Sequence, residues 1–152
     1  MNTIKLRPII TVEEKNTFVS EIQEAFQISY VSEFGEFEKQ VLPTEDIEES
    51  FNAKGAEAYI AEIGGERIGG AVIVIDDKTG YNSLHLLYVK SSAQNAGNGF
   101  KIWKAIEELH PETRIWETHT PYYDKRNIHF YVNRCGFKIV EFFNPKHKDP
   151  HQ

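Results

Sequence analysis

The sequence has little cysteine, no surplus of positive charge and no long hydrophobic run, and each shortage excludes a class of protein. Its 152 residues include one cysteine, Cys135, which excludes an internal disulfide and fits a reducing compartment. Lys and Arg number 17 against 23 Asp and Glu, for a formal net charge of -6, which argues against a nucleic-acid partner. The longest apolar stretch, from Ala71 to Ile75, is far too short to span a bilayer. We therefore expect a cytoplasmic protein with neither nucleic acid nor membrane as a partner.

The remaining composition is typical of a globular protein. Hydrophobic residues make up 40% of the chain and aromatic residues 12%, which is enough to build a core. A length of 152 residues suits one domain, and we expect it to cover residues 1–145, followed by a polar tail at 146–152. The sequence leaves the oligomeric state open, and a homodimer is among the assemblies that it allows.

Hydrophobic periodicity predicts helices and strands along the whole chain. A first helix is capped by Thr11, has Glu14 as the partner in a capping box, and ends before Gly35. Thr44 is predicted to open a second capping box, and residues 31–43 between the two helices show no clean period. Strands are expected at 4–10, 56–63, 67–75, 82–89, 114–120 and 137–143, and further helices at 45–53 and 125–134.

A loop with two glycines joins the strand that ends at Val89 to an amphipathic helix that ends at Leu109. The first turn of a helix offers unpaired N–H groups and a partial positive charge, and Gly97 and Gly99 let that backbone approach a ligand closely. This arrangement indicates a pyrophosphate site. A dinucleotide fingerprint needs a third glycine where Ile102 stands, and a Walker loop needs a Gly-Lys-Ser/Thr sequence that is not in this loop.

What remains is Gln94-x-x-Gly97-x-Gly99 after a strand. This pattern resembles motif A of the GCN5-related N-acetyltransferases (GNAT), the loop that binds the pyrophosphate of acetyl-CoA. The predicted order of strands and helices also resembles that of this family over nearly the whole chain. The resemblance implies an α+β fold, in which helices flank a mixed, mostly antiparallel twisted sheet and two strands splay apart at the acetyl-CoA site.

A second local pattern resembles motif B of the same family. Asp124 is followed by Phe130-Tyr131 and then by Gly136-Phe137, at the end of the predicted helix 125–134. The resemblance implies an N-acetyltransferase that moves the acetyl group of acetyl-CoA to a primary amine of a small molecule or peptide by direct attack, without a metal. Two alternatives stay open: a catalytically weak acyl-CoA-binding or regulatory module on the same fold, and a structural protein whose glycine loop binds nothing.

The resemblance also implies which residues hold acetyl-CoA. The pantetheine pairs with the backbone of the strand end, and the main-chain N–H groups of the loop bind the pyrophosphate. The residues concerned are Leu87, Tyr88, Val89, Gln94, Asn95, Ala96, Gly97, Asn98, Gly99 and Phe100.

Direct attack leaves two proton transfers that need an acid and a base. Tyr131 resembles the tyrosine acid of the family. For the base, His85 lies nine residues before Gln94, at a position where some arylalkylamine acetyltransferases have a histidine, and its ordinary pKa suits the task. Glu117 and His119 on the neighbouring strand are rival bases, and a chain of water molecules is a further alternative.

The spacing of motif B departs from the family pattern by one residue. Tyr131 lies five residues before Gly136, where the family has four, so Val132 has the usual spacing. Because Asp124 can cap the helix and set its phase, we count forward from it and assign the acid to Tyr131, with Val132 facing the core. The extra residue is then predicted among residues 133–135, as a turn residue or a π-bulge.

The segment between the first two helices is strongly acidic. Lys39 is its one countercharge up to Ser50. In this family the segment usually forms a wall of the acceptor site, so its field is predicted to attract cationic amines, with a solvated acidic surface as the alternative. The acidic residues are Glu33, Glu36, Glu38, Glu45, Asp46, Glu48 and Glu49.

Overall fold

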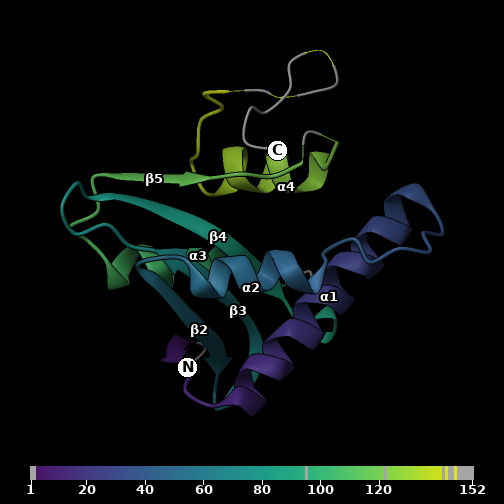
Figure 1. The fold of residues 1–152 in the computed structure, drawn as a ribbon, viewed down its shortest axis with the longest axis horizontal. Coiled ribbons are helices and arrows are strands. Elements are labelled where there is room, and N and C mark those ends of the chain that lie inside the picture. Colours follow the sequence, from purple (N-terminus) through teal and green to yellow (C-terminus); the bar gives the residue numbers. More distant parts are fainter. Residues whose placement is uncertain (1–2, 95, 122, 142, 144–145, 147–152) are drawn as a thin grey trace.

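A five-stranded mixed sheet is the centre of the computed structural model, which describes residues 3–94, 96–121, 123–141, 143 and 146 (Figure 1). Neighbouring strands follow the chain order β1-β2-β3-β4-β5. The first four are antiparallel, and β5 runs parallel to β4. Their bounds are β1 Ile4–Pro8, β2 Ala56–Ile63, β3 Glu66–Val74, β4 Tyr81–Val89 and β5 Ile115–Thr118.

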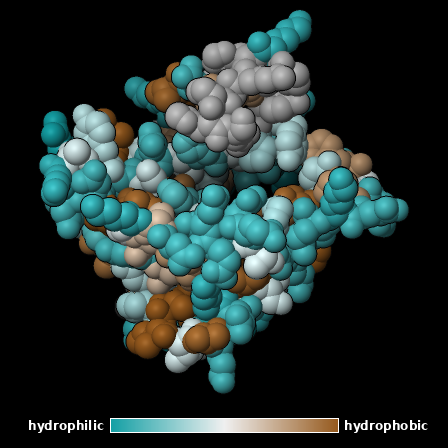
Figure 2. All heavy atoms as spheres, viewed as in Figure 1, coloured by the Kyte–Doolittle hydropathy of each residue, from teal (hydrophilic) through white to brown (hydrophobic). Residues whose placement is uncertain are grey.

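Helices cover both faces of this sheet. One buried cluster joins Phe18, Ile22 and Ile47 of the first two helices to β3 and β4, and a second joins Ile102 and Ile106 of the third helix to the opposite face. The view in Figure 2 is mostly hydrophilic, with apolar side chains in small groups. The helices are α1 Val12–Phe34, α2 Thr44–Asn52, the short 3-10 turn η1 Ser91–Ala93, α3 Asn98–Leu109, α4 Lys125–His129 and the π-helical turn η2 Phe130–Arg134.

The structure confirms the predicted α+β class and most of the elements. The Thr11 side chain accepts a hydrogen bond from the Glu14 backbone, and the Glu14 side chain accepts one from the Thr11 backbone, so the first capping box is present. The second capping box is wrong, because Pro43 occupies the N-cap of α2. Thr44 Oγ1 accepts instead from Gln23 Nε2 at 3.0 Å, which ties α2 to α1.

The predicted last strand is also wrong, because residues 137–141 and 143 adopt no strand conformation, and Phe142 lies outside the described residues. Ile139 and Val140 are 60% and 92% exposed. A strand is stabilised by its neighbours in the sheet rather than by residue type alone. The sequence 137–143 has the residues of a strand, but β5 pairs with β4 and not with this segment.

A carboxylate on α1 connects that helix to β3 and β4. The Glu21 side chain is 13% exposed and accepts hydrogen bonds from Arg67 Nη2 and from the Tyr88 hydroxyl, both at 2.8 Å. Burial alone would raise the pKa of Glu21, but the hydrogen bonds from Arg67 and Tyr88, with the charges of Arg67 and Lys90, hold it below its ordinary value. The ionised form is therefore the one that stabilises the fold.

We predict that Glu21→Gln lowers the free energy of unfolding by about 1.5–3 kcal/mol at pH 7, because charge-assisted hydrogen bonds are lost. Since the folded pKa lies below the unfolded one of about 4.3, the contribution is fully present above that pH and disappears as the pH falls through the folded pKa. Urea unfolding at pH 7 and at lower pH measures both effects.

Glu48→Gln is the matched control, because it removes one exposed ion pair with Lys15. Such a pair contributes less than about 1 kcal/mol. A Glu21→Gln protein as stable as this control at pH 7 would contradict the assignment.

Candidate functional site

The two parallel strands at the edge of the sheet pair over only half of β4. Their register runs from Tyr81 opposite Ile115 to Leu84 opposite Thr118, and β4 then continues along β3 as far as Val89. The Thr118 hydroxyl donates to the Leu84 carbonyl at 2.9 Å, at the last paired position. Beyond this point, the edge of β4 that faces away from β3 has no strand partner in the described part of the chain. The splayed strands implied by the motifs are therefore present.

The glycine loop follows the free end of β4 and is braced from inside. Gln94 Nε2 donates to the Val89 carbonyl at 3.0 Å, and Asn98 Nδ2 donates to the Ala93 carbonyl at 2.8 Å. Asn98 is 8% exposed, so it serves the loop rather than the solvent. Asn95, predicted as part of this loop, lies outside the described residues.

The loop geometry fits a phosphate group at the start of α3. Gly97 is the N-cap residue and has a φ of 72°, a left-handed conformation that favours glycine. It contributes no side chain to cap the helix, which leaves N–H groups of the first turn for a ligand. At Gly99, a Cβ would lie 3.1 Å from the Phe130 ring, so any larger residue there requires this ring at the start of η2 to shift.

A β-bulge places His85 on the other side of the sheet. Val72 pairs with Leu86 and Ile73 pairs with Leu84, which leaves His85 as the extra residue of β4. The His85 Nδ1 lies 3.3 Å from the Ser50 hydroxyl oxygen of α2. The strand pattern alone did not predict this bulge.

His85, Glu117 and His119 form one electrostatic group. Partial burial is the largest cause that lowers the pKa of His85, and the electrostatic influence of His119 lowers it further, whereas Glu117 opposes the shift. The structure thus brings the three candidate bases close together, with His85 beside Ser50 of α2. Burial and the nearby His119 together leave His85 more readily neutral than an ordinary histidine.

The helix that carries Tyr131 widens in its second half. Asp124 Oδ1 accepts from the Asn127 backbone at 3.0 Å, which confirms the predicted cap. After α4, the chain forms a π-helical turn in which the Cys135 N–H donates to the Phe130 carbonyl at 3.1 Å. A π-helical turn is therefore present, but its predicted position among residues 133–135 is wrong, because it begins at Phe130 and includes Tyr131.

Tyr131 lies on the α3 side of the sheet and is 8% exposed. Its ring packs edge-on against Phe137, with centroids 5.7 Å apart, and its hydroxyl neighbours the Thr118 side chain. Burial raises the pKa of this hydroxyl above its ordinary range, which keeps it protonated. The expectation that Val132 faces the core is wrong, because Val132 is half-buried and lines a cleft.

This cleft, of about 830 Å³, runs between β5 and the segment after η2. Trp103, Thr118, Thr120, Tyr123 and Tyr131 are among its lining residues. Trp103 Nε1 and Thr120 Oγ1 are buried without a hydrogen-bond partner in the described residues, which is rare for buried polar atoms. Sequence reasoning missed these two groups, because neither residue stands in a recognisable motif.

The remaining predicted cofactor residues differ in what they can offer. Tyr88 is 3% exposed, its hydroxyl donates a hydrogen bond to Glu21, and it pairs with Gly70 of β3, so its side chain is not available to a ligand. The Val89 carbonyl already accepts from Gln94. Leu87, Ala96 and Phe100 lie along the free strand end, the loop and the first turn of α3, where the motif places them.

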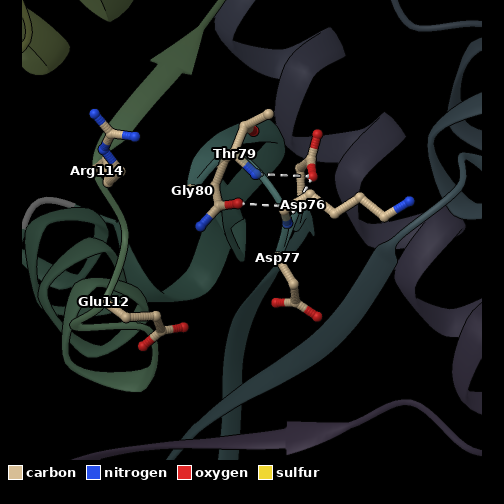
Figure 3. A pocket seen from close by; sticks show the side chains of 8 residues that line it. Asp76, Asp77, Thr79, Gly80, Glu112 and Arg114 are labelled. Carbon is tan, nitrogen blue, oxygen red and sulfur yellow. Dashed lines mark hydrogen bonds between the residues drawn. The ribbon is translucent and has the colours of Figure 1, made fainter.

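A smaller pocket of about 220 Å³ lies between the turn after β3 and the loop before β5 (Figure 3). Asp76 Oδ1 accepts from the backbone N–H groups of Lys78 and Thr79, and these bonds lower its pKa. Its carboxylate thus closes a turn. Across the described ranges, no three His, Cys, Asp or Glu side chains are grouped as metal ligands.

Comparison with known proteins identifies the family. Residues 19–137 match the model of the acetyltransferase (GNAT) family, so the chain belongs to the GNAT acetyltransferases. The Bacillus subtilis protein YrkN is 49% identical over 135 residues, which cover 88% of this chain and 73% of YrkN. No helix within the described part of the chain is long and apolar enough to cross a membrane.

Solved structures show the same fold. An acetyltransferase from Thermus thermophilus superposes with a TM-score of 0.68 at 18% identity, covering 95% of this chain and 94% of its own. A Bacillus subtilis acetyltransferase in complex with CoA gives a TM-score of 0.66 at 20% identity, with 98% and 86% covered. A GNAT family acetyltransferase from Elizabethkingia anophelis with acetyl-CoA bound gives 0.65 at 16% identity, with 93% and 80% covered.

We predict that the pKa of His85 lies below its ordinary value of 6.5 and responds in opposite directions to its two charged neighbours. Glu117→Gln removes a negative charge that favours the imidazolium, so it lowers the pKa further. His119→Gln removes a positive charge, so it raises the pKa. Nuclear magnetic resonance titration of the His85 ring measures both changes. Glu112→Gln, beside His110, is the control that leaves His85 unchanged; equal pKa values in all the proteins would refute the grouping.

Proposed function

We propose that this protein transfers the acetyl group of acetyl-CoA to a primary amine of a small molecule or peptide, by direct attack of the amine. The observation that carries the proposal is the divergence of β4 and β5 directly before the uncapped first turn of α3. When the thioester of acetyl-CoA lies in the gap, the pyrophosphate of the same molecule lies at the glycine loop. The relatives solved with CoA and with acetyl-CoA support this choice of donor.

In this reaction, the amine nitrogen bonds to the acetyl carbon, the carbon–sulfur bond breaks, and CoA leaves as a thiolate. The amine loses one proton and the thiolate gains one, so no covalent enzyme intermediate is needed. The backbone edge of Leu87–Val89 faces the gap and offers N–H groups that stabilise negative charge on the carbonyl oxygen. Cys135 has no role in this scheme, and burial raises the pKa of its thiol to about 11.

We assign the base to His85. Its lowered pKa keeps the ring neutral near pH 7, so it can accept a proton from the ammonium group of the acceptor, directly or through water. Glu117 and His119 remain rival bases because they lie close enough to His85 to affect its pKa. The assignment rests on the β-bulge, which turns His85 toward Ser50 on α2 at the mouth of the gap.

We assign the acid to Tyr131, on the opposite face. Its buried hydroxyl stays protonated and neighbours Thr118, the last residue of β5 before the strands diverge. A donor at this point reaches the gap from the α3 side, where a leaving thiolate needs a proton. The alternative of a catalytically weak acyl-CoA-binding module predicts CoA binding without release of thiol.

The test measures thiol release from acetyl-CoA with a panel of amines, together with CoA binding by calorimetry. We predict that Gly97→Asp weakens CoA binding about tenfold or more, because a carboxylate then lies close to the phosphate charges. Gly97→Asn is the matched control, since asparagine has the same shape, tolerates the left-handed conformation and carries no charge. Equal affinities of the two variants would contradict the phosphate site.

We further predict that Tyr131→Phe lowers kcat on the order of 10²-fold and leaves CoA affinity nearly unchanged, as expected for loss of a general acid. Steady-state kinetics with a saturating amine measures the change, and a pre-steady-state burst reveals whether product release limits the rate. Tyr59→Phe is the control, because that hydroxyl binds Glu57 at 2.7 Å and does not line the cleft. An undiminished kcat in a variant whose chemistry is rate-limiting would exclude Tyr131 as the acid.

A further inference from the structure

Four aromatic rings gather where the C-terminal end of α1 meets the segment after β5. Tyr30 lies 4.9 Å from Phe34 and 5.0 Å from Phe37, measured between ring centroids. Tyr123, which lies between β5 and α4, contacts Tyr30 at 6.2 Å and Phe34 at 5.7 Å, in edge-on geometry. This aromatic cluster therefore joins the two sides of the gap between β4 and β5.

The rings leave much of their surface open to solvent. Phe34 is 47% exposed, Phe37 39% and Tyr123 40%, and all four residues are absent from the two buried core clusters of the described structure. Tyr123 also lines the 830 Å³ cleft that contains Thr118 and Tyr131. The aromatic cluster is thus an exposed apolar surface that continues into the candidate active site.

The loop that carries Phe37 is held in place by one side chain of α1. Gln27 Nε2 donates to the Phe37 carbonyl at 3.3 Å and to the Lys39 carbonyl at 3.0 Å, and Gln27 Oε1 accepts from the Val41 N–H at 2.9 Å. These three bonds fix a segment that shows no regular secondary structure. Phe37 is therefore positioned before any ligand arrives, which reduces the entropy lost on binding.

Acidic residues lie next to the aromatic residues in the sequence on the α1 side. Glu33 lies three residues after Tyr30 and therefore on the same face of the helix, and Glu36 and Glu38 flank Phe37. The positive side chains of Lys125 and Arg126 belong to the opposite side, at the start of α4. The α1 side therefore suits a ligand that has an apolar ring, to pack against the aromatic side chains, and a nearby positive charge, to be attracted by the carboxylates.

We propose that the aromatic cluster binds the aryl group of the acceptor, so that arylalkylamines are the preferred acceptors. The proposal rests on the proposed acetyl transfer, because it assigns the part of the acceptor that does not react. Aromatic side chains bind aryl groups by edge-on and offset contacts, and the exposed carboxylates favour the cationic form in which such amines arrive. A short alkylamine has the reacting group and lacks the part that the cluster binds.

The experiment compares kcat/KM for 2-phenylethylamine and propylamine. We expect the wild-type protein to prefer 2-phenylethylamine by about tenfold or more, as aromatic contacts and ring burial predict. Phe37→Ala and Phe34→Ala should each remove most of this preference by raising KM for 2-phenylethylamine, with kcat/KM for propylamine nearly unchanged. Tyr81→Ala is the matched control: Tyr81 is 53% exposed, but it begins β4 at the end away from the gap. Circular dichroism verifies the fold of each variant.

A second measurement separates this proposal from the proposed function. Calorimetry of 2-phenylethylamine with the CoA-bound protein should show binding that Phe37→Ala weakens and Tyr81→Ala does not. If this pattern appears and no amine releases thiol, acetyl transfer fails and the aryl site stands. If propylamine or a polyamine is acetylated as efficiently as 2-phenylethylamine, or if the variants affect both amines equally, the aryl site is overturned and acetyl transfer stands.

Discussion

The site depends on the point at which β4 and β5 stop pairing. The Thr118 hydroxyl donates a hydrogen bond to the Leu84 carbonyl at the last position where the two strands pair. Beyond it, β4 is paired, among the described residues, with β3 only. One strand edge is thereby left with unpaired backbone groups beside a helix start that is also unpaired. Buried backbone groups require partners, so both features favour a ligand that supplies them. The packing of Ile102 and Ile106 under the sheet fixes where α3 begins, and with it the distance between the two sets of groups.

The gap also explains how groups from opposite faces of one sheet can act on one acceptor and one donor. A continuous sheet would separate His85, on the α2 side, from Tyr131, on the α3 side. Where the strands diverge, this barrier is absent, so the proposed base and the proposed acid can reach the gap from two directions. Their environments differ accordingly: His85 is exposed and influenced by neighbouring charges, whereas Tyr131 is buried and kept protonated. This division of roles follows from the topology rather than from either residue type.

The sequence predicted those parts of the fold that local patterns determine. Alternation located β2 at residues 56–63, and the Thr11–Glu14 capping box located the start of α1. Features that depend on distant partners were missed. The segment 137–143 has strand-forming residues but no neighbouring strand in the described structure, and the bulge at His85 exists only in the register with β3. The glycine loop was predicted because its motif has specific residues at fixed spacing, whereas Trp103 Nε1 and Thr120 Oγ1 stand out only because they are buried without a hydrogen-bond partner in the described residues.

The irregular spacing of the second motif has a physical explanation in the π-helical turn. The Asp124 cap fixes the phase of the helix, which places Tyr131 beside Thr118. The chain must also place Phe137 against Trp103, where their ring centroids lie 5.0 Å apart. In a regular α-helix, one more residue between Tyr131 and Phe137 would rotate Phe137 away from Trp103. The wide turn takes up that residue through the bond from Cys135 to Phe130, and the Phe137 N–H then closes onto the Tyr131 carbonyl at 2.9 Å. The added residue is thus absorbed within the π-helical turn that contains Tyr131, because the helix start and the aromatic core each hold one end of the segment in place.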